Sequence, residues 1–261
     1  MFFIACSILW SAQTVSTAAY AQRSNPDAAS ILAAVATAEV FKALATGWVA
    51  GWSYLKPNPN YLACAFCSVL CSALSYVVLE RTDASNYVPL LAVQHAVSPL
   101  MNRALGRTRE HSLASAILGA AAYAVVAAGC SGLAAAGTLA QSAFVCYAEA
   151  IDTETRDPKR EHFTASIFTA WTAFVMLFGA AVTRPYMLLP EKQPYALLTI
   201  ALVTATGMCR ARAASWGAHS PALATAAEAM LVTGGAIAFT GSVPSTASAV
   251  GTVLAVMAAA S

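Results

Sequence analysis

An acidic and a basic residue lie close together in an otherwise apolar stretch of the sequence. Glu39 and Lys42 interrupt the run from Ala28 to Tyr54, which is long enough to cross a bilayer. A charge near the bilayer centre costs at least about 2.5–3.5 kcal/mol, so such residues usually face a bundle interior or a water-filled cavity. Their i, i+3 spacing puts both side chains on one helical face, where carboxylate and ammonium neutralise each other. The pair fits a structural or gating ion pair, and direct substrate contact is the alternative.

Three more polar side chains fall inside apolar stretches. Gln94 and His95 are adjacent in the stretch 84–102, and Glu228 lies in the stretch 220–240 without a basic residue within four positions. Gln94 and His95 are polar at the depth of this stretch, where either a functional or a structural role fits them. Three roles fit Glu228: it can pair with Lys42, take up a proton, or face a wet cavity.

The cysteines do not form a convincing metal or disulfide motif. All seven lie in apolar segments, where cysteine usually behaves as a small buried hydrophobe. Cys64, Cys67 and Cys71 share one helical stripe, but no second Cys/His pair lies nearby at ligand spacing. We therefore expect packing rather than a metal. No nucleophile–His–acid set or phosphate loop is visible either, so we expect no enzyme and no cofactor.

The composition predicts a polytopic membrane protein. Hydrophobic residues make up 59% of the chain and charged residues 10%, whereas a soluble domain carries about 25% charged residues. The net charge of +2 is small and the basic residues are scattered, which argues against a nucleic-acid partner. The expected partner is the lipid bilayer.

Apolar runs between charged residues or Pro/Gly breaks predict ten membrane-spanning helices. The stretch between His111 and Glu149 has no charged residue, and as one helix it would be about 55 Å long against a core of about 30 Å. It must therefore turn, and Gly129-Cys130-Ser131-Gly132 is the place. The predicted spans are 2–21, 29–50, 60–79, 84–102, 112–129, 131–150, 163–183, 194–210, 220–240 and 243–260.

The distribution of Lys and Arg supports both termini in the cytoplasm, because short cytoplasmic loops are enriched in these residues. The inside loops then hold Lys56, Arg103, Arg107, Arg109, Arg156, Lys159, Arg160, Arg210 and Arg212. The outside loops hold Arg23, Arg81, Arg184 and Lys192. Tryptophans at positions 10, 48, 52, 171 and 216 lie largely near span ends, so we expect them in the interfacial belts.

The first stretch has two interpretations. Ala19-Tyr20-Ala21 resembles a signal-peptidase site, but a positively charged region before the apolar stretch is missing. We favour a first membrane span. Ten spans then divide after the fifth into two repeats, 1–129 and 130–261, and an odd number of spans per repeat inverts the second relative to the first.

Two motifs near the N-terminus resemble the nucleotide-sugar transporters of the drug/metabolite transporter superfamily. These are Tyr20-Ala21-Gln22 and Ala38-Glu39-Val40-Phe41-Lys42. In that family a Tyr-x-Arg ends the first span, and an Ala-Glu-aliphatic-x-Lys lies in the second at a similar distance. Gln22 takes the place of the arginine here, and Arg23 follows it directly.

The likeness continues to about residue 150 and is topological beyond that. Tyr76-Val77-Val78-Leu79 leads into Asp83-Ala84-Ser85-Asn86-Tyr87, which looks like the family's loop into the fourth helix. The segment 103–112 matches the place of its basic loop. Tyr147-Ala148-Glu149 is similar to its aromatic-x-Glu at the end of the sixth span.

The resemblance implies an antiporter that exchanges a nucleotide sugar, of the pyrimidine branch, against the nucleoside monophosphate in the Golgi or ER membrane. It implies a substrate site that includes Tyr87, Gln94, His95, His162 and His219. Gln94 and His219 stand where the family has lysines, and His162 with Thr164 represents the polar face of the seventh span.

Residues 71–73, read Cys-Ser-Ala, replace a Gln-Asn-Asn group of the family. Since cationic donors make the strongest phosphate contacts, the lost lysines weaken a nucleotide site unless Arg210 or Arg212 compensates. The alternative is therefore a transporter-derived scaffold or complex subunit that no longer transports. A homo-oligomer or a larger membrane complex fits either function.

Overall fold

The structure is a computed structural model in which every described segment with regular structure is helical. It describes residues 2–50, 59–107, 112–151, 167, 169–176, 178, 194–213, 221–241 and 243–261. Ten bounded helices and no strand occur in these residues, and residues 169–176 are helical as well. The prediction of an all-α protein is confirmed.

The helix bounds follow the predicted apolar spans closely. The helices are α1 (Phe2–Ser24), α2 (Ala28–Ala50), α3 (Pro59–Arg81), α4 (Ala84–Leu91), α5 (Gln94–Ala104), α6 (Leu113–Ala127), α7 (Gly132–Ile151), α9 (Pro194–Ala213), α10 (Pro221–Thr240) and α11 (Thr246–Ala260). The predicted turn at 129–132 separates α6 from α7. The predicted fourth span consists of two helices, α4 and α5, and most of the span predicted at 163–183 lies outside the described residues.

Local sequence signals explain the tight turn between α1 and α2. Asn25 ends α1 in the left-handed region with φ of 44°, and its N–H donates to the carbonyl of Ala21. Asparagine tolerates this conformation, and the following Pro26 cannot continue a helix. Asp27 then caps α2, because its carboxylate accepts a hydrogen bond from the Ser30 N–H at 2.8 Å.

Proline chemistry and a partner helix shape the α4–α5 pair. Pro89 lies inside α4 and has no N–H for the carbonyl four residues earlier, that of Ser85. The hydroxyl of Ser248 on α11 donates to this carbonyl at 3.0 Å, so it is satisfied by another helix. Ala92 and Val93 separate α4 from α5, and their N–H groups reach back only three residues.

The helix α6 approaches this break very closely. A Cβ atom built on Gly119 would lie 2.4 Å from the carbonyl oxygen of Ala92 and 2.8 Å from Cβ of His95. Only glycine therefore fits here without a shift of the backbone. The close contact fixes the α4–α5 break against α6.

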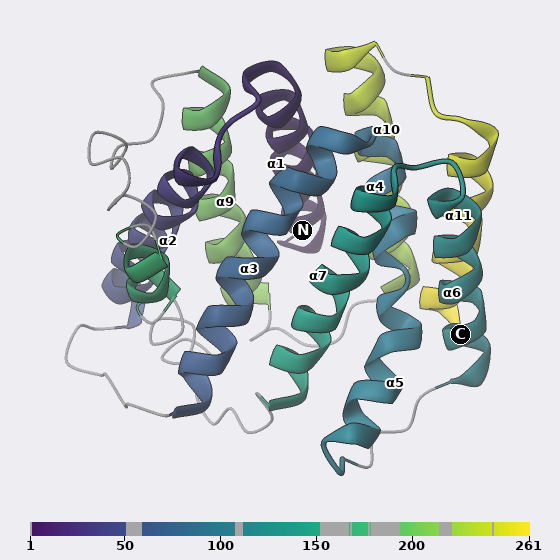
Figure 1. Ribbon diagram of the computed structural model, residues 1–261, viewed down its shortest axis with the longest axis horizontal. Coiled ribbons are helices and arrows are strands. Elements are labelled where there is room, and N and C mark those ends of the chain that lie inside the picture. Colours follow the sequence, from purple (N-terminus) through teal and green to yellow (C-terminus); the bar gives the residue numbers. More distant parts are fainter. Residues whose placement is uncertain are drawn as a thin grey trace.

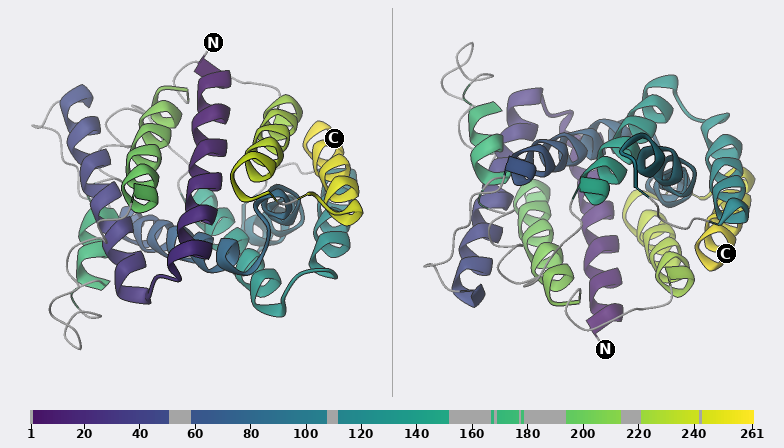
Figure 2. Two further views of the ribbon diagram at one scale, coloured as in Figure 1. Left: turned by 90° about the horizontal axis from the view of Figure 1, so that it is seen from above. Right: turned by 90° about the horizontal axis from the view of Figure 1, so that it is seen from below.

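The helices form two layers closed at one side by α6 and α11 (Figure 1). Figure 2 shows α1 between α9 and α10 in one layer, and α2 packs on the outer side of α9. In the other layer α3 packs along α7, and α7 packs against α5. The helix α4 contacts α6, α10 and α11, so the central part of the bundle is formed by both layers.

Hydrogen bonds identify the two ends of the bundle. At one end, Gln22 donates to the carbonyls of Leu79 and Thr82, which joins the last turn of α1 to the end of α3. At the same end, Arg23 donates to the Tyr195 hydroxyl and to the carbonyl of Phe239, so α9 begins where α10 ends. At the opposite end, the Ser115 hydroxyl in the first turn of α6 donates to the carbonyl of Ala258 in the last turn of α11.

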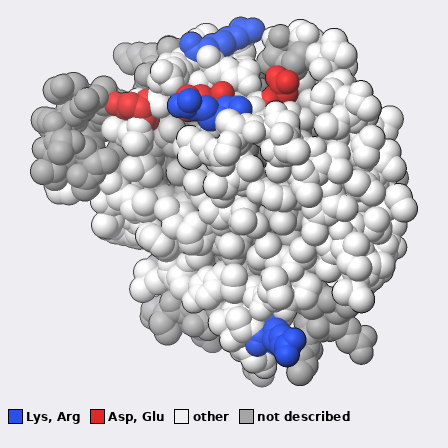
Figure 3. All heavy atoms as spheres, turned by 45° about the vertical axis from the view of Figure 1, so that its right-hand side comes forward, with Lys and Arg blue, Asp and Glu red and all other residues white. Residues whose placement is uncertain are grey.

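The surface between these ends is largely uncharged. On the face drawn in Figure 3, coloured Lys, Arg, Asp and Glu atoms gather at two opposite ends and a broad uncharged zone separates them. Large apolar side chains are widely exposed, among them Trp48 (84%), Leu113 (75%) and Met230 (75%). By length and composition, the windows Ala28–Ala45 and Leu62–Arg81 can cross a membrane, and five other described apolar helices are shorter, at 10–17 residues.

Candidate functional site

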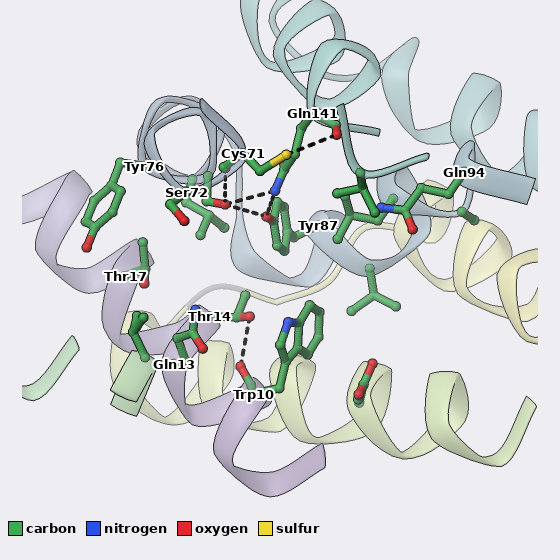
Figure 4. Close-up of a pocket in the computed structure, with 18 of the residues that line it drawn as sticks. Trp10, Gln13, Thr14, Thr17, Cys71, Ser72, Tyr76, Tyr87, Gln94 and Gln141 are labelled. Atoms are coloured by element: carbon green, nitrogen blue, oxygen red, sulfur yellow. Dashed lines mark hydrogen bonds between the residues drawn. The ribbon is translucent and has the colours of Figure 1, made fainter. Parts of the chain in front are cut away.

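A cavity of about 420 Å³ lies in the centre of the bundle, between the two layers. Its wall takes residues from α1, α2, α3, α4, α5, α7, α9, α10 and α11, so both halves of the chain contribute to it. Figure 4 shows Trp10, Gln13 and Thr14 on one side of this cavity and Cys71, Ser72 and Tyr87 on the opposite side. The cavity therefore has a mixed polar and aromatic wall.

Most of the site residues predicted from sequence line this cavity. Glu39, Tyr87, Gln94, His95 and Glu228 all belong to its wall although four different helices carry them. The remaining predicted residues divide into two groups. Lys42 pairs with Glu39 without being part of the wall, and His162 and His219 lie outside the described residues.

The ion pair of α2 has the geometry that its spacing predicts. The Nζ of Lys42 donates to Oε1 of Glu39 at 2.7 Å. The Glu39 side chain is 2% exposed and that of Lys42 is 19% exposed. The second oxygen of Glu39, Oε2, is buried and has no hydrogen-bond partner. One oxygen of the carboxylate thus pairs with lysine, while the other is enclosed by protein and has no hydrogen-bond partner among the described residues.

A hydrogen-bonded network around Gln141 forms a second polar part of the wall. Gln141 lies on α7, and its Nε2 donates to Ser75 Oγ at 2.9 Å and to the Tyr87 hydroxyl at 2.7 Å. The Ser75 hydroxyl donates to the carbonyl of Cys71, so the 2.9 Å contact between Ser75 and Tyr87 is donated by Tyr87.

This network fixes the orientation of the Gln141 amide. The hydroxyl protons of Ser75 and Tyr87 are already used, so both oxygens require a donor and Nε2 must face them. The amide oxygen, Oε1, consequently faces away from Ser75 and Tyr87. It is buried and has no hydrogen-bond partner among the described residues.

An aromatic pair stands next to this network. The rings of Trp10 and Tyr87 stack with their centroids 6.2 Å apart and an interplanar angle of 17°. Trp10 is in the middle of α1 and lines the cavity, so its predicted placement in an interfacial belt is wrong. The ring finds an aromatic partner in Tyr87 and therefore packs into the bundle. Trp48 and Trp171 are exposed, as the belt prediction requires.

His95 is held in one tautomer by its neighbours. The Ser115 hydroxyl donates to the carbonyl of Ala258 at 2.6 Å and lies 3.0 Å from His95 Nδ1. A serine has one proton to donate, so Nδ1 must carry the proton of this second hydrogen bond. In neutral His95 the lone pair is therefore on Nε2. The imidazole adds a further acceptor to a site that it lines.

The described wall of the cavity contains carboxylates but no Lys or Arg. Glu39 and Glu228 are its carboxylates, and the Lys42 ammonium pairs with Glu39. Among the described residues, no group of three His, Cys, Asp or Glu side chains is placed to hold a metal ion.

The cysteine stripe packs against α7, as expected. Cys64 and Cys71 donate from their sulfurs to the carbonyls of Ala148 and Gln141, at 3.7 and 3.5 Å. No disulfide bond joins any of the seven cysteines, all of which lie in the described residues. This agrees with the interpretation of Cys64, Cys67 and Cys71 as packing residues.

Sequence reasoning missed three functional candidates: Trp10, Ser75 and Gln141. A signal existed for Gln141, which is the only Asn or Gln between His111 and Glu149. A buried amide in an apolar span requires partners, so it indicates either a polar network or a site. Ser75 gave no such signal, because small hydroxyl residues are abundant in this chain.

Comparisons with known proteins give a fold without a function. No protein-family model matches the sequence, and no curated protein matches it. A solved structure described only as "Crystal structure of protein" is similar over 99% of this chain and 95% of its own length, with a TM-score of 0.62 and 14% sequence identity. At this identity the likeness shows the arrangement of helices alone, so the function must be argued from the cavity.

Proposed function

We propose that this protein is a membrane transporter whose solute binds in the central cavity. The observation that carries the proposal is the convergence of Glu39, Tyr87, Gln94, His95 and Glu228 on one cavity. Isolated polar residues in apolar helices are costly in a membrane and mark solute pathways when they meet. In a scaffold that does not transport, the same side chains would point into packed helix contacts.

The surface of the bundle supports a membrane location. The uncharged zone between two charged ends, with large apolar side chains exposed, is what a hydrocarbon core of about 30 Å requires. Short apolar helices such as α11 (Thr246–Ala260) reach this thickness only with help from flanking residues or local thinning of the bilayer. We therefore propose that the chain crosses the membrane ten times.

The helix contacts support two inverted five-span repeats, divided near residue 129. Spans 1–5 are α1, α2, α3, the α4–α5 pair and α6, and spans 6–10 are α7, the predicted span 163–183, α9, α10 and α11. When each span number is shifted by five, the contact of α3 with α7 becomes that of α9 with α1. In the same way, the contact of α5 with α7 becomes that of α10 with α1. The contacts of α4 and α5 with α6 correspond to α10–α11, while α6–α11 and α4–α10 correspond to themselves. This pattern is typical of a pseudo-two-fold axis, and transporters of this kind bind solute at the interface of the repeats.

The α4–α5 break gives the bundle a discontinuous helix beside the cavity. Transporters often bind their substrate where a membrane helix is interrupted, because backbone groups become available at that depth. Gln94 and His95 open α5 directly after the break. Small movements of α4 against α5 would change the shape of the wall, as alternating access requires.

The resemblance to nucleotide-sugar transporters extends the proposal to a specific cargo, exchanged against nucleoside monophosphate in the Golgi or ER membrane. Aromatic rings and an amide suit a nucleobase. A diphosphate needs cationic donors, and the described wall has no Lys or Arg. Arg210 or Arg212, or the histidines at 162 and 219, would have to supply this contact. This cargo therefore rests on the resemblance, whereas transport rests on the cavity.

The same missing cations favour the alternative function, a transporter-derived scaffold or complex subunit. Exchange in proteoliposomes separates the two functions. Purified protein is reconstituted, the lumen is loaded with UMP or CMP, and labelled nucleotide sugars are offered together with labelled amines, amino acids and neutral metabolites. We expect saturable uptake of one class.

A pair of variants on α7 controls this measurement. Gln141→Leu removes the amide from the cavity wall and should abolish uptake. Ser142→Ala changes the next residue, which is fully buried, outside the wall and without a hydrogen-bond partner, so uptake should persist. Absence of uptake of every solute by folded protein would favour the scaffold.

A further inference from the structure

We infer that the side chain of Gln22 is the latch of a gate, formed by α1 and α3, that closes the central cavity at the end of the bundle where Arg23 lies. The inference concerns how a solute reaches the cavity, and it rests on the proposed function only in that a transporter must open such a gate. It follows from the packing at this end of the cavity, from the hydrogen bonds of Gln22 and from a difference between the two repeats.

Buried side chains lie where α1 and α3 meet at this end of the cavity. Thr17 of α1 and Tyr76 of α3 are at the same edge of the cavity wall (Figure 4), and Leu79 also belongs to the wall. Tyr20 lies about one helical turn after Thr17, and its ring meets that of Tyr76 edge to face, with 5.9 Å between the centroids. Tyr20, Tyr76 and Leu79 are each at most 4% exposed. This layer separates the cavity from the ends of the two helices.

Gln22 joins α1 to α3 just beyond this layer. Its Nε2 donates to the carbonyl of Leu79 at 3.0 Å and to that of Thr82 at 3.2 Å. The last carbonyls of a helix have no partner within the helix, so an amide from another helix can satisfy them at the end of α3. Because α1 and α3 belong to opposite layers and the cavity lies between the layers, these hydrogen bonds hold the two layers together at one end of the cavity.

Arg23 holds the end of α1 within its own layer. It donates to the Tyr195 hydroxyl on α9 and lies over the ring, with 4.9 Å between the guanidinium carbon and the centroid. It also donates to the carbonyl of Phe239 on α10 at 3.1 Å. Since α1, α9 and α10 form one layer, these contacts can persist when the layers part. Opening this end therefore breaks the hydrogen bonds of Gln22 and leaves those of Arg23 intact.

The two repeats differ at this contact. The spans α1 and α3 correspond to α7 and α9 when each span number is shifted by five. Among the described residues, α7 and α9 do not pack against one another as α1 and α3 do. Inverted-repeat transporters reach their second state when one part of the bundle rocks against the other. The inverted relation predicts a second state in which α7 and α9 close the opposite end while α1 and α3 part.

The accessibility of a cysteine in the cavity wall tests the gate. Ser72 lines the cavity and is half-buried, so Ser72→Cys is made in a full-length background whose natural cysteines are replaced. Sealed vesicles are treated from either side with a membrane-impermeant methanethiosulfonate. Gln22→Ala and Gln22→Glu remove the donors of the latch. Each should raise the modification rate from the Arg23 side at least about threefold, because two modest hydrogen bonds are lost, and lower the rate from the opposite side.

A control at the same end of the bundle distinguishes the latch from a general effect. Glu80→Gln breaks the ion pair with Arg81, but both residues are on α3, so the modification rates should not change. An unchanged rate from the Arg23 side in the Gln22 variants would overturn the inference. A rise from both sides would overturn it as well, because it would show that the substitutions only loosen the bundle.

Uptake by proteoliposomes then separates this inference from the proposed function. A one-sided change of the modification rate together with uptake of a solute supports both. The same change without uptake of any solute supports the gate and counts against transport. Uptake with modification rates that Gln22 variants leave unchanged supports transport and overturns the gate.

Discussion

At the scale of single residues, the central feature is the set of polar side chains that line one cavity, namely Glu39, Tyr87, Gln94, His95 and Glu228. The Glu39–Lys42 spacing predicts the ion pair, and the structure confirms it at 2.7 Å. The sequence does not reveal that only one carboxylate oxygen is used. Nor does it reveal Gln141, whose partners Ser75 and Tyr87 are 66 and 54 residues away along the chain. Hydrogen-bond partners of this kind depend on how the helices pack.

Lys42→Met should destabilise the protein by about 3–5 kcal/mol, because it leaves the buried Glu39 carboxylate without its counter-charge. The double variant Glu39→Gln/Lys42→Met should recover most of this loss. The free energy of unfolding in detergent, measured with a denaturant titration, gives both values. If the single variant were as stable as the natural protein, the pair would have no structural role.

At the scale of elements, apolar runs predict nearly all of the helices, and the turn at 129–132 is predicted from length alone. The sequence does not predict the break at Ala92 and Val93, because the run 84–102 contains no Asp, Glu, Lys or Arg and reads as one span. Pro89 and Pro99 lie within it, but prolines are tolerated in membrane helices when neighbours satisfy the freed backbone groups. Ser248 on α11 does so for Ser85, and sequence alone does not pair these two residues.

The backbone contact from Ser248 can be measured with a double-mutant cycle. Ser248→Ala leaves the buried Ser85 carbonyl without a donor and should cost about 1–3 kcal/mol of the free energy of unfolding. In a Pro89→Ala background the new N–H can supply the hydrogen bond, so the same substitution should cost much less. Equal costs in both backgrounds would show that Ser248 does not replace the missing donor.

Gly119→Ala tests the close approach of α6 to the α4–α5 break. A methyl group there would lie 2.4 Å from the Ala92 carbonyl oxygen, so we expect a loss of about 1–3 kcal/mol from overpacking. Gly234→Ala on α10 is the control, since nothing lies within 4 Å of its built Cβ. Thermal unfolding of both variants in detergent measures the difference. A Gly119→Ala variant as stable as the control would place α6 further from the break.

At the scale of the whole molecule, the structure supports a bundle with two distinct ends, and transport requires that these ends face different compartments. Asp83 lies at the end that contains Arg23, and Arg103 lies at the end of α5, where the predicted inside loop begins. Composition and loop charge predict this orientation. They do not predict the cavity, which depends on side chains from nine helices.

Cysteine labelling tests the orientation of the ends. Asp83→Cys and Arg103→Cys are made in a background without the natural cysteines, and sealed vesicles are treated with a membrane-impermeant maleimide. We expect Arg103→Cys to react only from the cytoplasmic side and Asp83→Cys only from the opposite side. Reaction of both from the same side would contradict an odd number of membrane crossings between them.

The central claim is that a solute crosses the membrane through the cavity, and uptake by reconstituted protein tests it most directly. Proteoliposomes with the natural chain, Gln141→Leu and Ser142→Ala are compared for uptake of labelled nucleotide sugars, amines, amino acids and neutral metabolites. The account predicts saturable uptake by the natural chain and by Ser142→Ala, and none by folded Gln141→Leu. Equal uptake by all three proteins, or none by the natural chain for any solute, would contradict it.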